Sequence, residues 1–259
     1  MQKEPWDQPH TAEGREALIR LAAQYEQQGL ARERGITLTR LARMLKWVGS
    51  GRPGVGEFEW AAELGQQAVE LLRGTDDRLA LAGALRAAAQ PLVETGNREQ
   101  LLREALLISK EIGDLSGEGW AYFSLAVPPA ETKPLLDSAA ACFEECQDRL
   151  GLANVAQRRG ASTRDPKLFV NAAETFTELG RPLDAYRAFM MAGVFAHGRY
   201  SVEQREALFL QALEVARSSD LVAEQREALK SLADLMELAR REDDRANYRA
   251  QMEAIPFES

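Results

Sequence analysis

The amino-acid sequence predicts an all-α fold built from a row of packed helices. Apolar residues recur at helical spacing along most of the 259 residues. Segments of the chain also match one another at a constant offset of 34 residues, which is typical of stacked helical repeats. No stretch combines strand-length alternation of apolar and polar residues with β-branched residues, so we expect no sheet.

About thirteen helices are expected, with boundaries good to a few residues. In order they span residues 12–28, 31–48, 57–73, 76–95, 98–112, 115–127, 132–147, 149–160, 166–179, 182–197, 202–218, 220–240 and 243–253. Five glycines stand where helices are expected to stop: Gly29, Gly74, Gly96, Gly113 and Gly180. Four residues suit helix N-caps: Asp114, Asp165, Ser201 and Asp220.

The internal match is clearest in two Asp-x-x-Gly units. The segments EIGDLSGEGWA at 111–121 and ECQDRLGLANV at 145–155 carry Glu, Asp and Gly at the same positions, 34 residues apart. The register extends upstream without a gap, because leucines and an alanine in 101–105 recur in 135–139. This offset indicates a repeated supersecondary unit.

The clearest single unit is LFVNAAETFTELGRPLDAYRAFMMAG at 168–193. Its first half has Phe169 and Phe176 at the W-x2-L-G-x2-Y spacing, and after Gly180 the residues Ala185 and Phe189 supply A-x3-F. This unit resembles a tetratricopeptide repeat, and the Asp-x-x-Gly units are similar to the divergent repeats of bacterial transcription activators and signalling ATPases.

The resemblance covers residues 57–240. It implies a right-handed α-α superhelix in which the first helix of each pair lines a concave groove. We expect a helical hairpin and a glycine-rich connector over 1–56, and repeats over 57–259 that continue the same solenoid. The pattern departs from the family at His197, where proline usually ends the repeat, and its phase breaks near 158–166.

A glycine-rich stretch lies between the second and third expected helices. Residues Gly49 to Gly54 spell the G-x-G-x-x-G of dinucleotide-binding loops. Such a loop follows a buried strand, whereas the residues before this one have leucines at helical spacing. A P-loop is excluded too, because Glu57 stands where lysine is needed. We predict that Gly49 to Gly56 form a connector and bind no cofactor; a gripping or lid loop is the alternative.

The helix before this loop carries a basic stripe. Arg40, Arg43, Lys46 and Trp47 share one of its faces. The segment resembles the first helix of a helix-turn-helix, but the second helix would fall on SGRPGVGE, whose glycines and proline disfavour a recognition helix. The stripe is therefore either a solvated face or a surface for an acidic partner or nucleic acid.

Composition limits the classes of partner. The net charge is -8, with 45% apolar and 28% charged residues, which is ordinary for a globular protein. Negative charge argues against nucleic acid as the main partner. No apolar run approaches the roughly 20 residues that span a bilayer, and no secretory signal is recognisable, so we expect a cytoplasmic protein without a membrane partner.

Nothing in the sequence predicts a catalytic or metal site. Cys142 and Cys146 are four apart on one helix face, where side chains splay outward, and we interpret them as small buried residues. His10 and His197 are distant from them, so no zinc pattern forms. Serines, histidines and carboxylates have no catalytic spacing, and we expect no enzyme.

The sequence therefore predicts a non-enzymatic interaction module or adaptor that binds a partner peptide or helix in its groove. The resemblance implies eight exposed groove positions: Tyr122, Leu125, Arg158, Arg159, Lys167, Val170, Glu174 and Thr177. Two alternatives remain open. One is a regulatory domain that senses a small ligand or peptide in a closed pocket, and the other is a nucleic-acid-associated protein that uses the basic stripe. The sequence does not predict an oligomeric state.

Overall fold

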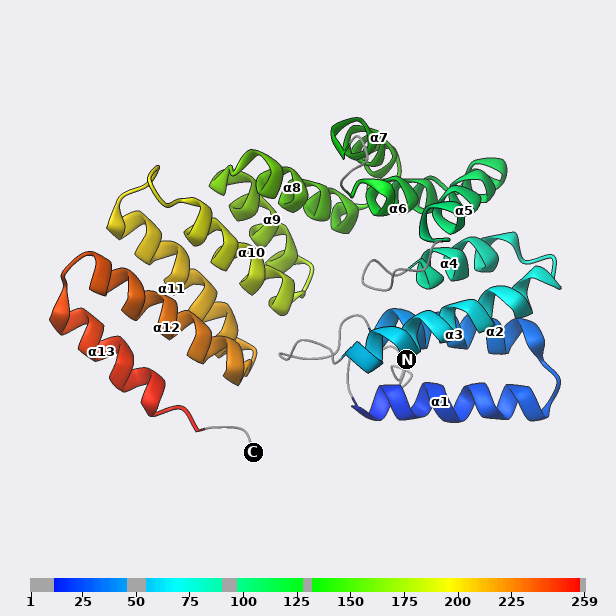
Figure 1. Ribbon diagram of the computed structural model, residues 1–259, viewed down its shortest axis with the longest axis horizontal. Helices are drawn as coiled ribbons and strands as arrows, with labels where there is room; N and C mark the ends of the chain where they lie inside the picture. Colours follow the sequence, from blue (N-terminus) through cyan, green and yellow to red (C-terminus); the bar gives the residue numbers. More distant parts are fainter. Residues whose placement is uncertain (1–11, 46–54, 90–96, 128–131, 257–259) are drawn as a thin grey trace. The chain divides into compact units, whose positions relative to one another are not determined.

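The structure is a computed structural model that describes residues 12–45, 55–89, 97–127 and 132–256. These residues form thirteen helices and no strand, so the all-α prediction is confirmed (Figure 1). The helices are α1 (Ala12–Gln27), α2 (Ala31–Leu45), α3 (Val55–Arg73), α4 (Arg78–Ala88), α5 (Arg98–Ile112), α6 (Leu115–Leu125), α7 (Thr132–Glu145), α8 (Arg149–Thr163), α9 (Pro166–Glu178), α10 (Pro182–Phe195), α11 (Val202–Ser218), α12 (Val222–Leu238) and α13 (Glu242–Glu253). The right-handed superhelix stays a prediction.

The chain divides into two compact units, Met1–Cys146 and Gln147–Ser259. Within each unit every helix packs on the next one along the chain, from α1 to α7 and from α8 to α13. In the first unit α4 also contacts both α2 and α6. Packing between chain neighbours is the arrangement of helical repeats. The boundary expected after residue 56 stays a prediction; α2 and α3, which flank it, pack together.

Aspartates begin three of these helices in the same way. The carboxylates of Asp77, Asp114 and Asp148 each accept a hydrogen bond from the backbone N–H three residues later, at 2.8–2.9 Å. This bond satisfies one of the donors that the first helical turn leaves without an acceptor. The Asp-x-x-Gly repeat in the sequence is therefore a helix-capping motif. In α6 a Cβ at Gly117 would lie 2.0 Å from the Asp114 carboxylate, so glycine lets this side chain take its observed position.

Of the three other predicted N-caps, two are confirmed and one is wrong. Asp165 caps α9, and Ser201 forms a capping box with Gln204 at the start of α11. The prediction for Asp220 is wrong, since Leu221 is the N-cap of α12. Asp220 instead has a φ of 53° and lies in the turn that ends α11. Aspartate tolerates this left-handed conformation better than most residues.

Left-handed glycines end helices where the sequence predicted stops. Gly29, Gly113 and Gly180 have φ values of 68°, 71° and 65°, which glycine adopts without steric cost. Gly74 lies in the turn after α3 without a positive φ, and Gly96 is outside the described residues. The helix expected to stop at residue 160 runs to Thr163, because the left-handed turn comes at Arg164.

Helix pairs approach closely where glycine faces an aromatic ring. A Cβ on Gly119 of α6 would lie 2.5 Å from the ring of Phe143 on α7, and one on Gly193 of α10 would lie equally close to Phe209 on α11. Phe143 is fully buried. Each ring thus occupies space that a side chain on the facing helix would take, which fixes how the two helices pack.

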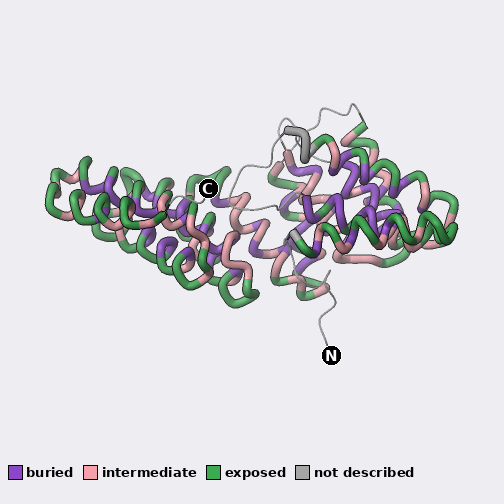
Figure 2. Tube along the Cα trace, turned by 90° about the horizontal axis from the view of Figure 1, so that it is seen from below, coloured by how far each residue is buried: buried purple, intermediate pink, exposed green. Residues whose placement is uncertain are grey.

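The apolar side chains form separate cores in the two units. Leu41, Leu72 and Leu85 belong to the main core of the first unit, and Phe176 and Leu229 to that of the second. Figure 2 shows buried positions alternating with exposed ones along the helices, as expected for amphipathic helices. None of the helices in the described ranges has the length and apolar character needed to cross a membrane.

Candidate partner-binding surface

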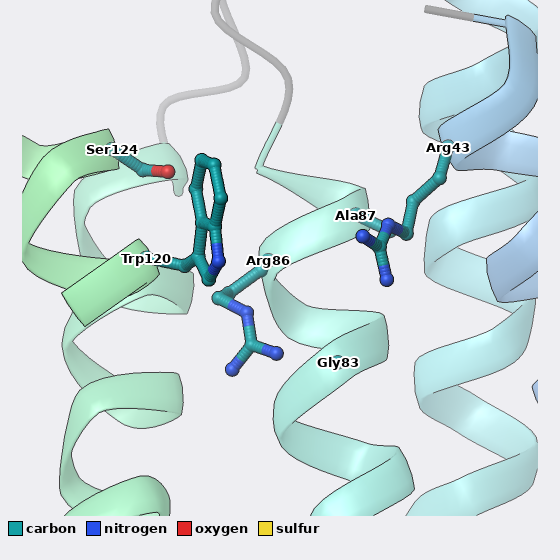
Figure 3. A pocket seen from close by; sticks show the side chains of 6 residues that line it. All are labelled: Arg43, Gly83, Arg86, Ala87, Trp120 and Ser124. Carbon is teal, nitrogen blue, oxygen red and sulfur yellow. The ribbon is translucent and has the colours of Figure 1, made fainter. Parts of the chain in front are cut away.

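A small pocket lies in the first unit where α4 meets α2 and α6. It has a volume of about 80 Å³. Its lining comes from three helices (Figure 3): Arg43 on α2, Gly83, Arg86 and Ala87 on α4, and Trp120 and Ser124 on α6. This volume exceeds the roughly 10–15 Å³ that one water molecule needs, so the pocket can admit a small chemical group.

Two arginines supply the charge of the pocket. Figure 3 shows Arg43 extending from α2 toward α4, which carries Arg86. Burial lowers the pKa of Arg86, an effect that Asp114 opposes and Arg43 reinforces. The Arg43 side chain is exposed to solvent, but protein atoms surround its guanidinium closely enough that lost hydration lowers its pKa as well. The two guanidiniums therefore act on each other as like charges in partly desolvated positions.

Within the described ranges, the side chain of Arg86 forms one long hydrogen bond. Its Nη1 donates to the hydroxyl of Ser109 at 3.5 Å, which is the long limit for such a bond. Asp114 is a nearby acidic group, but its carboxylate also accepts the capping bond from Gly117. Among the described residues, neither Arg43 nor Arg86 forms an ion pair.

Aromatic packing holds the indole of Trp120 in the pocket wall. Its ring meets Phe123 edge-on at 5.7 Å and Phe143 at 5.2 Å between centroids. Because Phe143 is itself fixed against Gly119, the position of the indole depends on the close packing of α6 on α7. Trp120 stays partly exposed and presents an apolar surface beside the two arginines.

The end of α6 positions Ser124. Arg98, at the start of α5, donates from Nη2 to the carbonyl oxygen of Ser124 at 2.5 Å. Figure 3 shows the Ser124 side chain on the same side of α6 as the indole of Trp120. The wall of the pocket formed by α6 thus combines one hydroxyl and one aromatic ring.

Two residues of the predicted basic stripe, Arg40 and Arg43, lie in the part of the chain that the structure describes. Arg43 lines the pocket, while Arg40 is exposed on α2 without lining it. Lys46 and Trp47 lie outside the described residues, and so does most of the loop from Gly49 to Gly56, since the structure resumes at Val55. The prediction that this loop is a connector therefore stays a prediction.

The two positions predicted on α6 differ from each other. Tyr122 is partly exposed, and the ammonium of Lys110 stands over its ring at 5.2 Å. Hydrogen bonding to Tyr122 raises the pKa of Lys110. The expectation that Leu125 is exposed is wrong: it is buried with Ala89 and Leu102. Its position in the last turn of α6 brings it into contact with the neighbouring helices rather than with solvent.

The predicted positions in the second unit lie on α8 and α9. Arg158 and Arg159 are half-buried on α8, Lys167 and Glu174 are exposed on α9, and Val170 packs against the apolar core. Thr177 is also exposed, and its hydroxyl donates to the carbonyl oxygen of Ala173 at 2.9 Å. The predicted phase break near 158–166 falls between these two helices, and α8 and α9 contact each other there.

A second pocket, of about 210 Å³, lies between these two helices. Asn171 and Thr175 line it from α9, one residue after the predicted Val170 and Glu174. Arg149 and Leu152 are among its residues from α8. Arg149 is ion-paired with Glu178, so the charge in this pocket is already balanced.

Sequence reasoning missed Arg86, Trp120 and Ser124. One signal was available, since Arg86 is the single charged residue in an alanine- and leucine-rich stretch, LALAGALRAAAQ at 79–90. The spacing within one repeat could not show that Arg86 lies near Arg43, because the two belong to different helix pairs.

The cysteines are free and partly buried, and burial raises the pKa of the Cys142 thiol. In the described part of the chain no group of three or more His, Cys, Asp and Glu residues is placed to hold a metal ion.

Comparison with protein-family models finds no match to this chain, and comparison with curated proteins finds none either. The resemblance to tetratricopeptide repeats therefore rests on the motifs within the sequence itself.

Proposed function

We propose that this chain is a non-enzymatic adaptor of the tetratricopeptide type that binds a segment of a partner protein on the surface formed by α2, α4 and α6. The observation that carries the proposal is the pocket at which Arg43, Arg86 and Trp120 meet. These side chains come from three different helices, and they present two positive charges beside a partly exposed aromatic ring. Arginine and tryptophan are the residues most enriched at the centres of protein interfaces.

Pocket size favours a protein segment over a small ligand. Sites for small molecules enclose roughly 300–1,000 Å³. Two pockets lined by residues that the structure describes, of about 80 and 210 Å³, are smaller than this range. They suit single side chains of a longer segment whose remaining contacts spread over the helix surfaces, which is how grooves recognise a bound helix or peptide.

Binding of a purified partner by variant proteins tests the proposal. The full chain is used to capture proteins from its source cell, and the main captured protein is then purified for isothermal titration. Ser124→Gln narrows the pocket without adding charge, and we expect it to weaken binding at least tenfold, about 1.4 kcal/mol.

Leu107→Gln is the matched control. Leu107 is 59% exposed on α5 and does not line the pocket, so this variant should bind like the wild type. Equal binding by wild type and Ser124→Gln, or the capture of no protein at all, would contradict the proposal. Turnover of a small molecule by the purified chain would contradict its non-enzymatic part.

A further inference from the structure

Resting on the proposed function, we infer that Arg43 and Arg86 together bind the carboxylate of an acidic side chain within the partner segment, while Trp120 packs against apolar atoms of the same segment. The site is the pocket of about 80 Å³ between α2, α4 and α6. The proposal gives the partner a chemistry: an internal acidic residue next to an apolar one.

The arginines of this pocket differ from two others that link helices. Arg73 bonds Glu104 at 2.7 Å and Arg241 bonds Glu206 at 2.8 Å, so a carboxylate balances each of those charges. Arg43 and Arg86 line the same pocket and have no such ion pair among the described residues, so Asp114 near Arg86 balances their two charges only in part. Two partly desolvated like charges cost free energy, and a bound carboxylate relieves that cost.

The pocket has room for the carboxylate. Gly83 lines it, and a Cβ built on Gly83 meets no atom within 4 Å, so the space above this part of α4 is open. A guanidinium fork matches the two oxygens of a carboxylate, and a second guanidinium can bond their remaining lone pairs. The glycine and Ala87 beside them leave an apolar floor for the methylene groups of Asp or Glu.

The charge of the whole chain favours a protein source for this carboxylate. At a net charge of -8 the chain repels long polyanions, so the free-energy gain from two arginines is small against the repulsion of a nucleic-acid backbone. A single acidic side chain carries only one charge, and the indole of Trp120 gives the neighbouring apolar residue a surface to contact.

Selection from a phage library of random peptides on the full chain tests the inference. We expect the selected peptides to be enriched in an Asp or Glu near an aromatic or aliphatic residue. Isothermal titration then compares one selected peptide with its twin in which that acid is replaced by the corresponding amide. The amide twin should bind at least tenfold more weakly, and Arg86→Gln and Arg43→Gln should each remove most of the difference between the twins.

Two matched variants separate charge from structure. Gly83→Asp places a carboxylate in the pocket while both arginines remain, so it should weaken binding of the acidic peptide as Arg86→Gln does. Gly83→Asn has nearly the same shape without the charge and should bind more tightly than Gly83→Asp. Arg103→Gln removes an arginine whose partner is Glu99 on the same helix, and binding should not change.

The midpoint of thermal unfolding distinguishes a binding role of the two arginines from a structural one. If the two charges destabilise the free protein, Arg86→Gln should unfold at the same temperature as wild type or higher. A structural role predicts a lower midpoint instead, and that result would count against the inference.

The outcomes also separate this inference from the proposed function. Selected peptides without acidic enrichment, or acidic peptides that bind independently of both arginines, would overturn the carboxylate site and leave the adaptor function standing. Tighter binding of a short RNA than of the acidic peptides, lost in Arg86→Gln, would replace the carboxylate by phosphate. Selection of no peptide would overturn both.

Discussion

At the scale of single residues, the sequence Asp-Arg-Leu occurs at 77–79 and again at 148–150, and it has two structural functions. In both, the aspartate caps the helix that follows, and the arginine reaches a glutamate on the next helix: Arg78 pairs with Glu111, and Arg149 with Glu178. The first function is local, and the second links one helix to its neighbour. A three-residue similarity in the sequence thus corresponds to a repeated set of contacts.

The cap at Asp77 leads to a prediction about stability and pH. Asp77→Ala should lower the free energy of unfolding by about 1 kcal/mol at neutral pH, because the N–H of Ala80 loses its acceptor. Asp77→Asn keeps a capping oxygen and should lose less. Denaturation in urea, followed by circular dichroism, measures both differences.

The effect should depend on pH in a defined direction. The hydrogen bond from Ala80, and then the contact with Arg32, hold the pKa of Asp77 below its ordinary value of 3.8. A carboxyl whose pKa is lowered by folding stabilises the protein fully above its unfolded pKa, and this contribution is lost as the pH falls through the folded pKa. The difference in the free energy of unfolding between wild type and Asp77→Ala should therefore become smaller below pH 3.8. If this difference stayed constant below pH 3.8, the charge of Asp77 would not contribute to the stability of the protein.

At the scale of helices, the sequence predicted the elements well and their contacts only in part. Helical spacing and turn residues located the helices, because both signals are local. Asp220 was misassigned because aspartate suits both an N-cap and a left-handed turn, and only the turn geometry distinguishes them. Leu125 was misassigned because its burial depends on Ala89 and Leu102 from other helices.

The packing of α6 on α7 gives a second prediction. Gly119→Ala should destabilise the protein, because the added methyl lies 2.5 Å from the ring of Phe143. Overpacking costs about 1–3 kcal/mol, whereas replacing glycine by alanine in a helix gains up to about 1 kcal/mol, so the net effect is a loss. The free energy of unfolding from urea titrations measures the change.

Two controls make this prediction specific. Gly83→Ala adds the same methyl to α4 where no atom lies within 4 Å, so it should stabilise the protein slightly. Phe143→Leu combined with Gly119→Ala should cost less than the sum of the two single changes, since the smaller side chain leaves room for the methyl. Strictly additive effects would mean that the glycine and the ring do not interact.

At the scale of the whole chain, the sequence predicted a repeat protein but not its candidate binding surface. The repeat pattern reports contacts between neighbouring helices, which recur with the period of the sequence. The pocket instead combines side chains of α2, α4 and α6, none of which follows another directly along the chain. Of the predicted partner-binding residues that the structure describes, Arg43 lines it and the others do not.

The repeat architecture predicts how the chain responds to truncation. Deleting the residues from Leu221 onward removes α12 and α13, which contain 17 and 12 helical residues. In the second unit each helix contacts its chain neighbours, so the helices from α8 to α10 should remain folded and only α11 should fray. Helical circular dichroism should therefore fall by about the share of helix removed.

Hydrogen exchange locates the effect within the truncated chain. Exchange should rise most in α11, where Leu213 and Ala216 lose the apolar side chains of α12. A smaller rise is expected in α10, because the hydroxyl of Tyr186 loses its 2.9 Å hydrogen bond to Glu227. Protection in α8 and α9 should persist, since their contacts with each other and with α10 are intact. Loss of protection against exchange throughout α8–α11 would contradict this prediction. It would show that the second unit folds as one cooperative bundle, in which each helix depends on all the others.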